Sequence, residues 1–151
     1  MSIFAAFAHH LCFVAIMLLL SFEMLLLKQP LTLVSARKIM RYDAIYGAFA
    51  GAVLIVGALR VMYFEKGPLY YMHSTPFMVK MALFIAVGLI SLYPTFTFLK
   101  WRKQLQQGVT PELDGTQSRK LRIVIHVELT LLLFMMLCAT MMAKGIGYLG
   151  N

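Results

Sequence analysis

Four long apolar blocks constrain this chain more than any other feature of its sequence. They cover residues 3–27, 43–64, 76–99 and 121–144. A helix that crosses the ~30 Å hydrocarbon core of a bilayer needs about 20 apolar residues, and each block meets that length. The blocks do not alternate apolar with polar residues, so a membrane β-barrel is excluded. The sequence therefore predicts an all-α, transmembrane four-helix bundle that forms one integral membrane domain over residues 1–151.

The composition also points to a lipid environment. Hydrophobic residues make up 61% of the chain and charged residues 13%, and the mean hydropathy is +0.80. Water-soluble domains carry about a quarter charged residues, so a soluble class is excluded. A net charge of +8 would favour nucleic-acid binding in a soluble chain, but in a membrane protein its main effect is on orientation. We expect the lipid bilayer as the main partner and no nucleic acid.

Basic residues gather in two of the three connections between the blocks. Segments 28–42 and 100–120 together hold nine of the 14 Lys and Arg residues. By the positive-inside rule these two segments lie on the cytoplasmic side of the membrane. Both termini and the segment 65–75 then lie on the opposite, outer side, which gives an N-out/C-out topology.

Several ionisable side chains fall inside or at the edges of the apolar blocks. A charge that faces lipid there costs about 2.5–3.5 kcal/mol or more, so these side chains should face the bundle interior. Their positions along the helices divide them into two groups, one near each surface. The outer group is His9, His10, Arg60 and Lys80, and the cytoplasmic group is Glu23, Asp43, His126 and Glu128.

The outer group predicts a cofactor site centred on His10. Imidazole ligates the iron of haem b inside helical bundles, and His10 with His73 is the pair of metal ligands that the sequence favours. Arg60 and Lys80 would then bind the haem propionates, beneath a polar loop that contains Glu65, Lys66, Tyr70 and Tyr71. In the structural alternative, His10 bonds a neighbouring carbonyl and Lys80 pairs with Glu65 or extends to the membrane surface.

The cytoplasmic group predicts proton-handling chemistry. Glu23 and Glu128 join Arg60 and Lys80 as candidate catalytic residues, and His126 is a further candidate cofactor contact. Glu23 with His126 forms either an ion pair or a proton relay, and both alternatives stay open. His126 and Glu128 differ by about 200° around a helix, so they cannot both line one cavity.

Two further features carry weaker signals. The 12 methionines, together with His9, His10 and Cys12, make copper an alternative cofactor. Gly47 and Gly51 form a small-xxx-small face of the kind that allows helices to approach closely. That face predicts a homo-oligomer.

Several segments carry a resemblance to known families. The runs HHLCFVAIMLLLSFEMLLLKQPL, YDAIYGAFAGAVLIVGALRVMYF and RIVIHVELTLLL resemble an uncharacterised bacterial family of small four-helix inner-membrane proteins. His10-Leu11, Lys80 and Glu128 resemble positions of the HemJ family of protoporphyrinogen oxidases, although Val127 replaces an expected Asn. The HemJ resemblance implies a haem-b bundle in which His10 and Lys80 serve one site. A looser similarity to the copper-resistance D family supports copper.

These observations lead to one leading function and two alternatives. The leading hypothesis is a haem-b protein of the bacterial inner membrane. It would act in electron transfer or as a HemJ-like oxidoreductase on a tetrapyrrole or quinone. The first alternative is transport of copper, protons or a small solute, and the second is an accessory structural membrane subunit.

Overall fold

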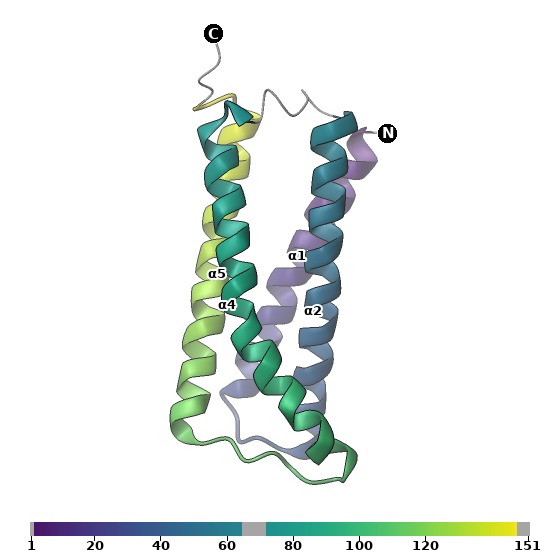
Figure 1. Cartoon of the computed structure of the whole chain (residues 1–151), viewed down its shortest axis with the longest axis vertical. Coiled ribbons are helices and arrows are strands. Elements are labelled where there is room, and N and C mark those ends of the chain that lie inside the picture. The colour runs from purple at the N-terminus through teal and green to yellow at the C-terminus, as the bar shows by residue number, and fades with distance from the viewer. Residues whose placement is uncertain (1, 65–71, 148–151) are drawn as a thin grey trace.

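The computed structural model describes residues 2–64 and 72–147, and the chain in these ranges is built from helices. Helix α1 spans Ser2–Leu27, and α2 spans Leu33–Leu59 and continues as a π-helix, η1, over Arg60–Phe64. Helix α4 spans Thr75–Gln106 and α5 spans Gly115–Ala143. Both ends of the chain lie at one end of the bundle, the terminal end (Figure 1). We call the opposite end, which holds the connections 28–32 and 107–114, the basic end.

Among the described residues, four helices are long and apolar enough to cross a membrane, which confirms the predicted all-α transmembrane bundle. Large apolar side chains cover the outside of this bundle. Leu18, Ile55, Leu89 and Phe134 are each more than half exposed. Lipid chains solvate such side chains as well as a protein core does. The outer surface of the bundle is therefore suited to contact with lipid chains rather than with water.

The helices extend further toward the basic end than the apolar blocks predict. The prediction that residues 28–42 form a connection is wrong, because α2 begins at Leu33. Its first turn is fixed by a capping box, in which the Thr32 and Ser35 side chains each accept a hydrogen bond from the other's main-chain N–H, at 3.1 and 2.8 Å. Hydropathy marks only the part of a helix inside the hydrocarbon, so the charged turns beyond it were missed. As a result, the basic residues of 33–42 and 100–106 stand on helices.

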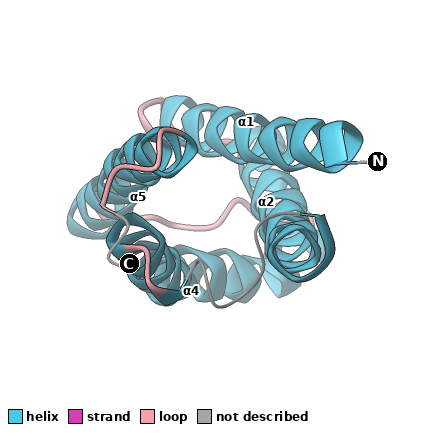
Figure 2. Ribbon diagram, turned by 90° about the horizontal axis from the view of Figure 1, so that it is seen from above, coloured by secondary structure: helices cyan, strands magenta, loops and turns pink. Residues whose placement is uncertain are grey.

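The helices form a circle in the order α1, α2, α4, α5, in which each contacts its two neighbours (Figure 2). Most of the fully buried large side chains lie in the half of the bundle nearer to the basic end, among them Leu20, Ile39, Phe98, Leu121 and Ile125, whereas Met135 lies toward the terminal end. Toward the terminal end the α1–α2 pair and the α4–α5 pair diverge (Figure 1). The basic-end half therefore holds the larger share of the buried core in the described chain.

Helix α4 bends on its way to the basic end and leans toward α2 (Figure 1). Pro94 lies inside this helix and is buried. Proline has no N–H to donate and its ring clashes with the preceding turn, so it kinks a helix at such a position. The bend brings the last turns of α4 to the first turns of α2.

Replacement of Phe98 by alanine is expected to destabilise the bundle. Phe98 is fully buried, and its ring centroid lies 5.0 Å from that of Trp101. We expect a loss of about 1–3 kcal/mol, below the 3–5 kcal/mol typical of water-soluble cores because lipid solvates the unfolded helices. The matched control is Phe96→Ala, since Phe96 is 58% exposed on the same helix. Thermal unfolding in detergent should show a lower midpoint for Phe98→Ala alone, and equal midpoints would contradict this packing.

Candidate functional site

Three carboxyl groups from three helices lie inside the basic-end half of the bundle, near enough to act electrostatically on one another. Glu23 comes from α1, Asp43 from α2 and Glu128 from α5, and we call them the buried acidic cluster. Glu23 is 1% exposed and Glu128 is 0% exposed. The charges that act on Glu23 come from Asp43 and Glu128, and the charge that acts on Glu128 comes from Asp43. The acidic groups therefore interact with one another rather than with a cation.

The helical repeat explains why these carboxyls point inward. In α5 the buried residues recur every three or four positions, and Glu128 takes one of these positions between Ile125 and Leu132. Glu23 stands in the same way between Leu20 and Leu27 in α1, and both of those leucines are buried. Asp43 lies in the buried row of α2. Each acid thus occupies a position in the row of buried residues along its helix, where the neighbouring positions hold apolar side chains. We call this buried row the seam of the helix.

The cluster has few hydrogen bonds. The Thr95 hydroxyl of α4 donates to Oδ1 of Asp43 at 2.8 Å. Over the described parts of the chain, Oε1 of Glu23 and both carboxyl oxygens of Glu128 have no hydrogen-bond partner. An ionised carboxylate buried in this way is very unfavourable, and a second one beside it raises the cost further. The carboxyl groups of Glu23 and Glu128 are therefore most stable when they hold a proton.

Tyr46 completes the cluster and was missed by the sequence analysis. It lies three residues after Asp43 on α2, is 5% exposed, and interacts electrostatically with all three acids. Residues three apart share a helix face, so the spacing to Asp43 was the signal that could have identified Tyr46. With Thr95 on α4, all four spanning helices contribute a polar side chain to one interior region.

The structure does not bring His126 into this region. His126 is exposed on α5, whereas Glu128, two residues further on, is buried. The 200° separation predicted for these two residues requires this result. The expectation that Glu23 pairs with His126 is therefore corrected, and Glu128 and Asp43 are the groups that act on Glu23.

A second cluster lies in the terminal-end half, and we call His9, Arg60 and Lys80 the terminal cationic cluster. His9 interacts electrostatically with both Lys80 and Arg60, and Lys80 interacts with Arg60. The His9 ring packs on α2, where a Cβ atom added at Gly57 would lie 3.2 Å from its Cε1 atom. Gly57 thus makes room for the imidazole between α1 and α2.

The histidine that faces the bundle interior is His9 and not His10. His10 is exposed, and its Nδ1–H donates to the main-chain oxygen of Ala6 at 2.6 Å. The two rings lie edge to face, with centroids 6.1 Å apart. Adjacent helical residues differ by about 100°, so only one of them can point inward, and the sequence gives no rule for which one. The expectation that His10 lies at the centre of an interior site is corrected accordingly.

The remaining predicted residues are placed as follows. His73 is exposed just before α4, and the predicted loop residues Glu65, Lys66, Tyr70 and Tyr71 lie outside the described residues. In the ranges that the structure describes, no three His, Cys, Asp or Glu residues are grouped so that they could hold a metal ion. Gly47 and Gly51 are exposed, and a Cβ atom at either would meet nothing within 4 Å. The homo-oligomer predicted from these glycines stays a prediction.

The fold and the two clusters define a class, namely polytopic membrane proteins whose interior carries ionisable side chains from several spans. Within that class, the chain belongs to the family described as predicted membrane protein (DUF2214), which matches residues 1–147. This confirms the prediction of an uncharacterised family of small membrane proteins. No curated protein and no solved structure matches the chain, so the resemblance to HemJ gains no support there.

Removal of the hydroxyl of Thr95 is expected to destabilise the bundle, because Asp43 would lose its hydrogen bond. Thr95→Val keeps the shape of the side chain and should cost about 0.5–1.5 kcal/mol, a range typical of such bonds in membranes. Thr97→Val is the control, since the Thr97 hydroxyl bonds only the main-chain oxygen of Tyr93 in the same helix. The unfolding midpoint in detergent should fall for Thr95→Val, and an equal effect of both changes would contradict a role for the Asp43 bond.

Proposed function

We propose that this protein binds and releases protons within the membrane as part of proton-coupled transport. The observation that carries the proposal is the burial of Glu23 and Glu128, of which Oε1 of Glu23 and both carboxyl oxygens of Glu128 lack hydrogen-bond partners in the described chain. Ionisable residues inside a membrane bundle are expensive, and in transporters they serve as proton sites. A purely structural role would be served better by the apolar residues that fill the other seam positions.

The positions of the two clusters favour coupled transport over a passive proton channel. His9 and Glu23 lie fourteen residues apart on α1, which corresponds to about 21 Å along the helix axis. Between them the α1 seam carries Ile16 and Leu20, which are 3% and 1% exposed. These apolar side chains interrupt a continuous chain of proton carriers along α1. Proton transfer across it would require the helix pairs to move, as in alternating access.

The terminal cationic cluster supports an anionic group as the second ligand. Arg60 and Lys80 lie close enough to interact electrostatically inside the bundle, beside His9. Two neighbouring cations attract a carboxylate or phosphate group more strongly than a neutral solute. We place the protein in the bacterial inner membrane, with the basic end at the cytoplasm as the positive-inside rule requires.

The proposal predicts that Glu23 and Glu128 hold protons at neutral pH. Infrared spectroscopy should detect the C=O stretch of protonated carboxylic acid in the purified protein, and this band should disappear in the Glu23→Gln, Glu128→Gln double variant. In liposomes that contain a pH-sensitive dye, an inward gradient of a carboxylate or of inorganic phosphate should drive proton uptake, and the same variant should lose this uptake. Glu112→Gln is the control for both measurements, because Glu112 is exposed in the connection at the basic end.

The two readouts separate the possible failures. A band that persists in the double variant contradicts the assignment of the proton sites. A band that disappears without any change in proton uptake contradicts transport and leaves the acidic cluster as a static feature. Unfolding midpoints close to that of the unmodified protein would show that the substitutions keep the fold, since glutamine has the same shape as glutamate.

His9 supports haem-linked redox chemistry as a second candidate function. Its Nδ1 atom is buried and has no hydrogen-bond partner in the described chain, and Arg60 and Lys80 lie beside it. These residues fit one axial ligand and two contacts for propionates. Haem bound there would supply one-electron chemistry toward a quinone or tetrapyrrole.

The adjacent histidines provide a matched test of this second candidate. Purified protein that contains haem should show a Soret band that shifts on reduction with dithionite. His9→Ala should abolish the band, whereas His10→Ala should retain it, because only His9 faces inward. A colourless preparation from haem-replete cells, or loss of the band in His10→Ala alone, would contradict haem ligation by His9.

A further inference from the structure

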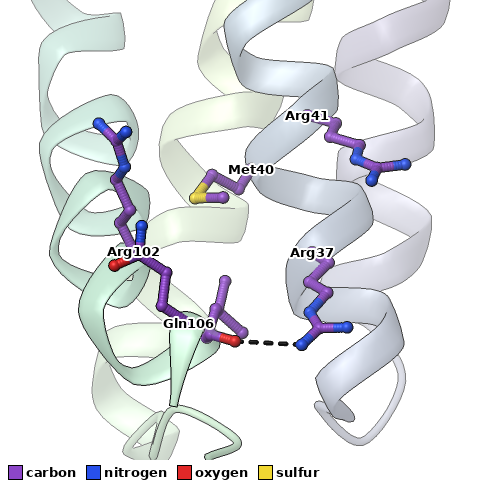
Figure 3. A pocket seen from close by; sticks show the side chains of 6 residues that line it. Arg37, Met40, Arg41, Arg102 and Gln106 are labelled. Atoms are coloured by element: carbon purple, nitrogen blue, oxygen red, sulfur yellow. Dashed lines mark hydrogen bonds between the residues drawn. The ribbon is translucent and has the colours of Figure 1, made fainter. Parts of the chain in front are cut away.

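A cavity of about 300 Å³ opens at the basic end, between α2 and the last turns of α4 (Figure 3). Three arginines line it, Arg37 and Arg41 from α2 and Arg102 from α4. The remaining lining residues are Met40, Leu105 and Gln106. The cavity thus combines a strongly cationic rim with apolar side chains.

Arg37 joins the two sides of this cavity. Its Nη2 atom donates to the main-chain oxygen of Leu105 at 3.1 Å, and Figure 3 shows the bond reaching from α2 to α4. The main-chain oxygens in the last turn of a helix lack partners within the helix, so a guanidinium group stabilises that end. Arg37 therefore has a structural role and fixes the width of the cavity.

Arg41 and Arg102 are not used in this way. Both are exposed, and Figure 3 shows their guanidinium groups directed away from each other and away from the space between α2 and α4. In the described ranges the hydrogen bond between the two sides of the cavity comes from Arg37 and not from Arg41 or Arg102. Exposed arginines change rotamer within nanoseconds, so both groups can turn toward a ligand between the helices. Because Arg41 and Arg102 lie on helices, their main-chain positions are better defined than they would be in a flexible loop.

We propose that this cavity binds the phosphate group of an anionic phospholipid from the cytoplasmic leaflet. Guanidinium groups form paired hydrogen bonds to phosphate, and their placement at the basic end coincides with the membrane surface that carries anionic lipids. Met40 and Leu105 lie where the glycerol and the first methylene groups of the lipid would pack. A soluble phosphate compound would use the guanidinium groups but not the apolar side chains. This proposal does not depend on proton transport.

The test compares lipid retention by two double variants of equal charge. Arg41→Gln, Arg102→Gln removes the two mobile guanidinium groups and keeps the Arg37 bond. Lys38→Gln, Lys103→Gln removes the same number of charges from exposed residues of the same helices that do not line the cavity. Native mass spectrometry of the full chain with phosphatidylglycerol and phosphatidylcholine of identical acyl chains measures the preference for the anionic lipid.

The unmodified protein and the lysine variant should prefer phosphatidylglycerol, and the arginine variant should lose that preference by roughly tenfold or more. Phosphatidylglycerol should also raise the unfolding midpoint of the first two proteins more than that of the third. An equal loss of the preference for phosphatidylglycerol in both variants would show that the lipid is attracted by net charge alone, and it would contradict binding in the cavity. Displacement of bound lipid by millimolar inorganic phosphate would identify a soluble ligand and overturn the lipid assignment.

Discussion

Exclusion of water by the helix seams is the constraint on which the rest of this structure depends. Apolar side chains line the seams of the four spanning helices, and hydrocarbon surrounds their outer faces. A carboxyl group in such a seam can be satisfied only by a proton, a cation or a hydrogen-bond donor. The donor that the structure supplies to Asp43 is Thr95, while Oε1 of Glu23 and both carboxyl oxygens of Glu128 are enclosed without one among the described residues.

The same constraint separates the molecule into two functional halves. The basic-end half is tightly packed, with Phe98, Leu121 and Ile125 fully buried, and it encloses the acidic cluster. The terminal-end half holds His9 and the two cations where the helix pairs diverge (Figure 1). In the proposed function, the densely packed half would bind protons and the half in which the helix pairs diverge would attract the anion. The arginine cavity lies beyond both clusters, at the membrane surface.

Helix length links these regions. From hydropathy alone, the second span begins and the third span ends next to the charged residues. In the structure both helices continue for about two to three further turns toward the basic end. The capping box at Thr32 and the Arg37 bond to Leu105 stabilise these extensions outside the hydrocarbon. Because of them, the basic residues from which the sequence predicts the orientation in the membrane stand on helices rather than in loops.

The sequence by itself determined the class of fold and the depth of each ionisable residue, because bilayer thickness fixes helix length and the rise per residue fixes position along the axis. It placed Glu23, Asp43 and Glu128 near one surface and Arg60 with Lys80 near the other. Only the tertiary structure decided the direction of each side chain around its helix. The choice of His9 over His10, and of Asp43 rather than His126 as a neighbour of Glu23, depends on how the helices rotate when they pack. Apolar residues occupy all faces of these helices, so the hydropathy pattern does not show which face turns toward the bundle interior.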